Sequence, residues 1–75
     1  MYLKRLKDLR EDADAQQSNI ADVLKITRQQ YSLYELGKRD LPAEFIRTLA
    51  KYYNTSIDYI VGLSDNKNSS NKKTS

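Results

Sequence analysis

Apolar residues recur every three or four positions along most of the chain, which is the spacing of one face of an α-helix. They form successive groups within residues 2–13, 20–24, 31–34, 45–53 and 57–63. No stretch of four or more residues alternates strictly between apolar and polar side chains, as a half-buried strand would. The pattern therefore predicts an all-α fold of five short helices.

The third of these helices has the clearest predicted boundaries. Thr27 is a favourable N-cap for a helix over residues 28–36, and Gly37 ends that helix as a left-handed residue. About three residues around Lys25 separate it from the second helix, so the two helices must cross steeply, as in a helix-turn-helix. The other helix starts are marked by Gln16 or Ser18, by Pro42 in the first turn with Glu44, and by Ser56 with Asp58.

The end of the chain has a different composition. Residues 64–75 contain no apolar side chain, and such a segment buries too little surface to offset the entropy lost on ordering it. We therefore expect a single folded domain over residues 1–63, followed by a disordered polar tail over residues 64–75.

Composition removes most enzyme classes. The 75 residues include no Cys and no His, which excludes disulfide frameworks, thiolate metal sites and catalysis by Ser-His or Cys-His pairs. We expect no catalytic residue, no metal, no cofactor and no small-molecule substrate. The first residues do not resemble a signal peptide, and the apolar run 59–61 is far too short to span a membrane. These features favour a cytoplasmic protein without a membrane partner.

The net charge of +3, from 13 basic and 10 acidic residues, is weak evidence by itself. Its distribution says more. Residues 11–22 contain four acidic side chains and no basic one, whereas residues 25–39 contain four basic side chains and one acidic one. The predicted helix-turn-helix therefore has a basic side, which suits a nucleic-acid partner.

Residues 16–42 resemble the XRE or Cro/cI-type helix-turn-helix family of phage repressors and bacterial regulators. The likeness extends over residues 2–63, and it implies a five-helix, lambda-repressor-like DNA-binding domain of bacterial or phage origin. The residues that carry it are Gln17, Ile20-Ala21, Thr27, Ser32, Glu35-x-Gly37-Lys38-Arg39, Leu49-Ala50 and Ser56-x-Asp58-Tyr59.

The chain departs from the family pattern at four positions. Asp14 stands where members usually have Gly, and we expect it to tolerate the left-handed turn there. Ala15 replaces a larger aliphatic residue, Tyr31 replaces Ile or Val, and Leu36 replaces a polar residue. The last two changes alter the surface around the third helix.

One face of the third helix is predicted to read bases. At about 100° per residue, Tyr31 and Tyr34 point inward and Glu35 lies at the boundary beside Arg28. Arg28 can donate two hydrogen bonds to guanine, Gln29 can pair with adenine, and Leu33 can contact a thymine methyl group. An ordinary solvated helix start is the alternative. The predicted base-contacting residues are Arg28, Gln29, Ser32 and Leu33, and Leu36 shares their face without an assigned role.

Phosphate contacts are expected on either side of this helix. The resemblance implies them for Gln17, Lys38 and Arg39, and we add Thr27 and, in the turn, Lys25. Solubilising surface charge is the alternative for the basic residues. Such contacts provide affinity and salt dependence but no sequence preference.

The resemblance also pairs Arg10 with Glu35 as a structural ion pair that joins the first helix to the end of the third. In that arrangement Arg10 could also reach a phosphate. The tyrosines have two interpretations as well, as a stacking platform for bases or as core residues, and their helical spacing favours the core.

Two functions fit these observations. The first is a sequence-specific regulator of transcription, a repressor that binds double-stranded DNA at a palindromic operator as a homodimer. The second is a protein-interaction module, such as the antitoxin of a toxin–antitoxin pair. A dimer surface would use the fifth helix and the segment near Leu41, with Ile57, Ile60 and Leu63 as candidates.

Overall fold

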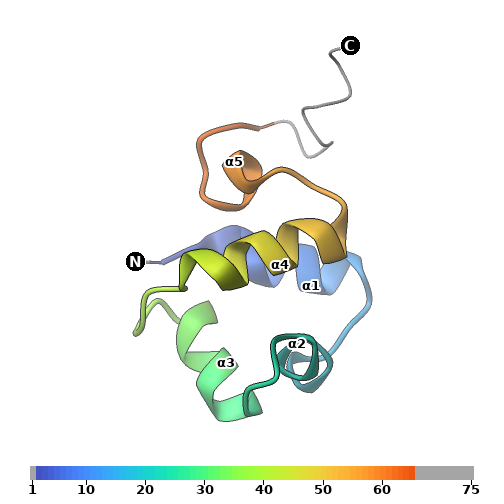
Figure 1. Cartoon of the computed structure of the whole chain (residues 1–75), viewed down its shortest axis with the longest axis vertical. Helices are drawn as coiled ribbons and strands as arrows, with labels where there is room; N and C mark the ends of the chain where they lie inside the picture. Colours follow the sequence, from blue (N-terminus) through green and yellow to red (C-terminus); the bar gives the residue numbers. More distant parts are fainter. Residues whose placement is uncertain (1, 66–75) are drawn as a thin grey trace.

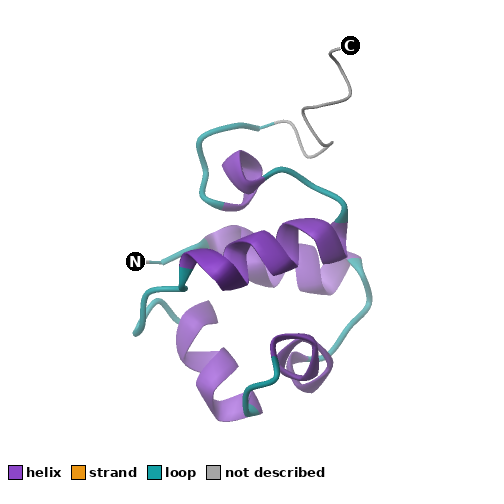
Figure 2. Cartoon of the chain, viewed as in Figure 1, coloured by secondary structure: helices purple, strands orange, loops and turns teal. Residues whose placement is uncertain are grey.

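The computed structural model describes residues 2–65, and within that range the chain forms five α-helices and no strand (Figures 1 and 2). The all-α prediction is confirmed. Residues 66–75, most of the predicted disordered tail, lie outside the described residues. The helices are α1 (Lys4–Asp12), α2 (Gln17–Leu24), α3 (Arg28–Glu35), α4 (Ala43–Tyr53) and α5 (Ile57–Ile60).

One hydrophobic core draws side chains from every helix. Isolated helices this short are unstable in water, so the fold depends on burying their apolar faces together. Tyr31 is the largest fully buried side chain, and Tyr34 packs edge-on against Phe45, with the ring centroids 6.1 Å apart. The core residues are Leu3, Leu6, Leu9, Ile20, Ala21, Leu24, Tyr31, Leu49, Ala50 and Ile60.

Most of the tyrosines contribute to packing, although Tyr2 is 63% exposed and Tyr52 is 48% exposed. Ile60 is also a core residue, 1% exposed, so it is unavailable for the dimer surface proposed from the sequence. Ile57 and Leu63, the other two candidates on and after α5, are exposed.

Each of these helices is followed, within two residues, by a residue with positive φ. The next N–H then reaches back to a carbonyl in the last turn, as in Lys38 N to Leu33 O at 2.9 Å and Ile26 N to Ala21 O at 3.0 Å. Asp14 adopts φ 57°, as expected for a residue that replaces glycine, and Gly37 adopts φ 76°. The full set is Asp14, Lys25, Gly37, Asn54 and Gly62.

The helix starts match the sequence predictions with small shifts. Gln16 is the N-cap of α2, and Asn19 supports it by accepting a hydrogen bond from the Gln16 N–H at 2.8 Å. The Ser56 hydroxyl caps α5 by accepting from the Tyr59 N–H at 3.0 Å. Pro42 is the N-cap of α4 and stands one residue before its first turn, and α3 ends at Glu35, one residue earlier than predicted.

Figure 1 shows α2 and α3 at one end of the long axis and α5 at the other, with α1 and α4 between them. Arg5 of α1 holds the α5 end together. Its guanidinium lies 4.1 Å from the centroid of the Tyr59 ring and donates to the Tyr59 carbonyl at 2.9 Å. It also donates to the Ser64 carbonyl and, at 2.9 Å, to the Asp65 carboxylate, so two residues of the predicted tail contact α1.

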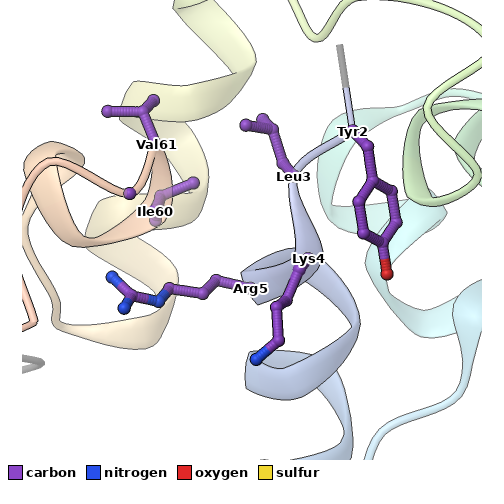
Figure 3. A pocket seen from close by; sticks show the side chains of 7 residues that line it. Tyr2, Leu3, Lys4, Arg5, Ile60 and Val61 are labelled. Carbon is purple, nitrogen blue, oxygen red and sulfur yellow. The ribbon is translucent and has the colours of Figure 1, made fainter.

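The start of the chain and the end of α5 enclose a shallow groove (Figure 3). Leu3 lies between Tyr2 and the α5 residues in this view, and the Arg5 side chain extends toward α5. The groove lies at the end of the molecule away from α2, so it belongs to the packing of α5 on α1.

Replacing Arg5 with alanine should lower the free energy of unfolding by about 1–3 kcal/mol, because two partly buried carbonyls lose a charged donor and Tyr59 loses its cation. The control is Lys4→Ala, whose ion pair with Asp8 has a lysine side chain 71% exposed. That change should cost less than about 0.5 kcal/mol. Urea denaturation measures both, and equal effects of the two substitutions would contradict this role for Arg5.

Candidate nucleic-acid interface

The turn between α2 and α3 is short and well defined. Lys25 ends α2 in the left-handed region, and Thr27 then starts α3. The Thr27 hydroxyl accepts from the Gln30 N–H at 3.1 Å, and the Gln30 side chain accepts from the Thr27 N–H at 3.0 Å. This reciprocal cap fixes the first turn of α3, as predicted from Thr27.

Buried residues on both helices lock the pair together. Ile20, Ala21 and Leu24 of α2 share the core with Tyr31 of α3. On the opposite side of α3 the amino-terminal end is open to solvent, and Arg28 and Gln29 are exposed there. The arrangement therefore presents a short helix with a polar end outward and an aromatic side inward.

The other predicted base-contacting residues are less accessible. Ser32 and Leu33 are half-buried, whereas Leu36, just beyond α3, is 60% exposed. Glu35 is buried, so it does not lie at the surface boundary beside Arg28, where the helical wheel placed it. The wheel failed there because side chains of α1 and α2 cover the last turn of α3.

The predicted ion pair between Arg10 and Glu35 is present and bidentate. Arg10 Nε donates to Glu35 Oε2 at 2.7 Å, and Nη2 donates to Oε1 at 3.2 Å. The side chains are 14% and 5% exposed. Arg10 Nη1 donates to the Ala15 carbonyl at 3.1 Å, so the guanidinium also holds the turn that leads into α2. All three nitrogens of Arg10 are thus engaged inside the fold.

The pKa of Glu35 shows which effects dominate at this pair. Burial alone would raise it, but hydrogen bonds from Arg10 and Gln17, together with the neighbouring Tyr31, outweigh burial and lower it. The pKa of Arg10 is raised, chiefly by its hydrogen bond to Glu35. Burial and then Glu35 raise the pKa of the Tyr31 phenol, so Tyr31 remains neutral. The pair is therefore fully charged at neutral pH.

Gln17 connects this buried pair to the exposed end of α3. Its Nε2 donates to Glu35 Oε1 at 3.1 Å, and its Oε1 accepts from Arg28 Nη1 at 3.3 Å. The sequence did not predict this connection; it predicted a phosphate contact for Gln17 and a base contact for Arg28. The spacing of these residues in the sequence contains no signal for the contact, because it depends on how α2 packs against α3.

The remaining candidates lie around α3 at the surface. Thr27, at the start of the helix, is exposed, although its hydroxyl is occupied by the cap. Lys25 in the turn and Lys38 and Arg39 beyond Gly37 are also exposed. Positively charged side chains therefore lie before and after α3, and Arg28 and Gln29 lie between them in the sequence.

Nothing in the described part of the chain points to another kind of site. Residues 2–65 include no grouping of three or more His, Cys, Asp or Glu side chains suited to a metal ion. The helices found there also lack the length and apolar character needed to cross a membrane.

Comparison with known proteins agrees with this geometry. The family model described as helix-turn-helix (HTH_3) matches residues 6–60, from α1 to the end of α5. The chain belongs to the XRE-type helix-turn-helix family. The matched range includes α1 from Leu6 onward, all of α2 to α5, both residues of the ion pair and every predicted contact residue.

The chain is also similar to named members of this helix-turn-helix family. The chain is 34% identical over 65 residues to the uncharacterized HTH-type transcriptional regulator YobD of Bacillus subtilis, covering 87% of this chain and 58% of the relative. It is 37% identical over 59 residues to the HTH-type transcriptional regulator ImmR of Bacillus subtilis, and the match covers 79% of this chain and 46% of ImmR. The cryptic phage CTXphi transcriptional repressor RstR of Vibrio cholerae is 29% identical over 65 residues, and the match covers 87% of this chain and 59% of RstR.

The chain thus spans about half the length of these helix-turn-helix relatives, between 46% and 59%. No solved structure matches the chain.

Proposed function

We propose that this protein is a sequence-specific regulator of transcription that binds double-stranded DNA by placing α3 in the major groove. The observation that carries the proposal is the exposed, polar amino-terminal end of α3, held outward by a buried Tyr31 and flanked by basic residues. In helix-turn-helix docking, that end of the second helix meets the base edges.

The assigned contacts follow from side-chain chemistry. Arg28 offers the fork of donors that matches guanine O6 and N7, and Gln29 offers the donor and acceptor that match adenine. Ser32 and Leu33 lie farther along α3 and are half-buried, so their contacts would be made only where the groove wall approaches the helix closely. Leu33 suits a thymine methyl group.

We further propose that the protein represses transcription as a homodimer on a palindromic operator. One α3 touches only a few base pairs, so two copies are needed for useful specificity, with half-sites about one helical turn apart. The similarity to a phage repressor supports the repressor role. Such an operator would lie in bacterial or phage DNA in the cytoplasm, and the function requires no catalysis and no cofactor.

Phosphate contacts should make binding depend on salt. Each of the changes Lys38→Ala and Arg39→Ala should weaken binding to all duplexes alike and should reduce the slope of log K against log salt by about 1. The control is Lys51→Ala, at the far end of α4, which should leave the slope unchanged (Figure 1).

Fluorescence anisotropy with a mixed-sequence duplex, at several salt concentrations, measures these slopes. Binding that is absent even at low salt would contradict the DNA-binding proposal. Co-purification of a small partner protein with such a chain would instead favour the antitoxin function.

A further inference from the structure

Two leucines give the outward face of α3 an apolar end. Leu36, directly after the helix, is 60% exposed, and Leu33 is half-buried. Within residues 2–65, neither belongs to the hydrophobic core or to the side chains packed against it, whereas Tyr31 and Tyr34 do. The two leucines therefore leave apolar surface beside α3 that the core does not use.

Helical geometry places both leucines in one row with Gln29. The N–H of Leu36 donates to the Ser32 carbonyl at 3.0 Å, so Leu36 continues the last turn of α3. Gln29, Leu33 and Leu36 are spaced by four and three residues, which puts them on the same face of the helix. The row begins with an exposed amide and ends with two apolar side chains.

The turn after α3 holds the backbone of Leu36 in place. The Lys38 N–H donates to the Leu33 carbonyl at 2.9 Å, which closes the end of the helix. Gly37 lies so close to the start of the chain that an added Cβ would stand 2.9 Å from Tyr2 Cα. Leu36 is thus presented from a backbone that is fixed on both sides.

The charges around this row indicate what covers it. Lys38 and Arg39 follow Leu36 directly and are exposed, and Arg28 is exposed at the other end of the helix. These cations suit a phosphate backbone. The apolar group that base edges present in the major groove is the C5 methyl of a pyrimidine, which thymine carries and cytosine lacks. An exposed leucine between cations therefore matches that methyl group.

We propose that Leu33 and Leu36 form a methyl-reading pair, which recognises C5 methyl groups of pyrimidines in the major groove. The inference rests on the proposed function and extends it to Leu36. Thymine supplies the methyl group in ordinary DNA, and 5-methylcytosine supplies the same group in modified DNA. Three residues of helix advance about 4.5 Å and one base pair advances about 3.4 Å, so the two leucines meet neighbouring base pairs.

Uracil is the probe, because it differs from thymine only by lacking the C5 methyl. Each thymine of the duplex that the wild type selects from a random pool is replaced in turn by uracil, and fluorescence anisotropy at constant salt measures binding. Uracil at two neighbouring positions in each half-site should weaken binding about fourfold, the value of burying one methyl group. Where cytosine replaces thymine there, methylation of that cytosine at C5 should restore about fourfold.

Variants of Leu36 assign the effect to the side chain. Leu36→Asn keeps a similar size but is polar, and it should reduce the uracil effect at one of the two positions to below about twofold. Leu36→Met remains apolar and should retain the effect. The control is Thr48→Ala, exposed on α4, which should leave both uracil effects unchanged. Circular dichroism verifies that each variant is folded.

Three results would count against these assignments. Uracil without effect on the wild type, or an unchanged uracil effect in Leu36→Asn, would overturn the methyl-reading pair. If Leu36→Asn kept the uracil effect and instead weakened cooperative binding to the two half-sites, Leu36 would belong to a contact between two copies of the chain. A wild type that selects no site from the pool would contradict the proposed function itself.

Discussion

Replacing Glu35 with alanine is expected to lower the free energy of unfolding by about 3–5 kcal/mol, because the change leaves the guanidinium of Arg10 buried without its partner. That guanidinium is 14% exposed, and it loses two of its three protein contacts at once. Gln17 also loses its acceptor. Thermal and urea denaturation measure the effect.

The matched control is Glu11→Ala. Glu11 pairs with Lys7 at 4.0 Å, but its side chain is 56% exposed, so its removal should cost less than about 0.5 kcal/mol. We expect the Glu35 variant to lose DNA binding mainly because less of it is folded. Unchanged melting combined with lost DNA binding would show that Glu35 acts in the complex and not in the fold.

The same pair makes stability depend on pH in a defined direction. In the folded protein the pKa of Glu35 lies below its ordinary value of 4.5. The ionised Glu35 therefore contributes its full stabilisation at pH values above the pKa that it has in the unfolded chain. The contribution is lost as the pH falls through the folded pKa. Below about pH 4.5 the wild type should lose its stability advantage over Glu35→Ala, and a constant difference down to pH 2 would contradict this assignment.

Replacing Gly37 with alanine should destabilise the fold by about 2–5 kcal/mol, since two costs add. Gly37 has φ 76°, a conformation that costs an L-residue about 1–2 kcal/mol. A Cβ there would also lie 2.9 Å from Tyr2 Cα, and such overpacking costs about 1–3 kcal/mol more. The turn after α3 would shift, and Lys38 would move with it.

Gly62→Ala separates the backbone cost of positive φ from the cost of overpacking. Gly62 has φ 87°, but a Cβ added there meets nothing within 4 Å. This variant should therefore lose only the backbone term of about 1–2 kcal/mol. Equal losses of stability in the two glycine variants would show that the start of the chain does not press on the turn after α3.

Much of this architecture was accessible from the sequence because it is local. Thr27, Gly37 and Ser56 act on their own helix ends, so residue type and position were enough to place α3 and α5. The left-handed conformation of Asp14 was expected because the family that the chain resembles usually has Gly at this position. The helical spacing of Tyr31 likewise predicted its place in the core.

What the sequence could not supply depends on packing between distant segments. Arg5 meets Tyr59 and Asp65 only because α5 folds back over α1. Glu35 is buried only because Arg10 and Gln17 cover it, which a helical wheel of α3 cannot show. The link from Gln17 to Arg28 likewise requires the crossing of α2 and α3. Interactions of this kind join elements, and no single stretch of sequence contains them.

The most direct test of the account is selection from a random duplex pool, at a stated salt concentration, with the wild type and with Gln29→Ala. The wild type should enrich a palindromic site with half-sites about one helical turn apart, and Gln29→Ala should relax the preference at one position in each half-site. No enrichment at low salt would contradict the claim that α3 reads DNA sequence.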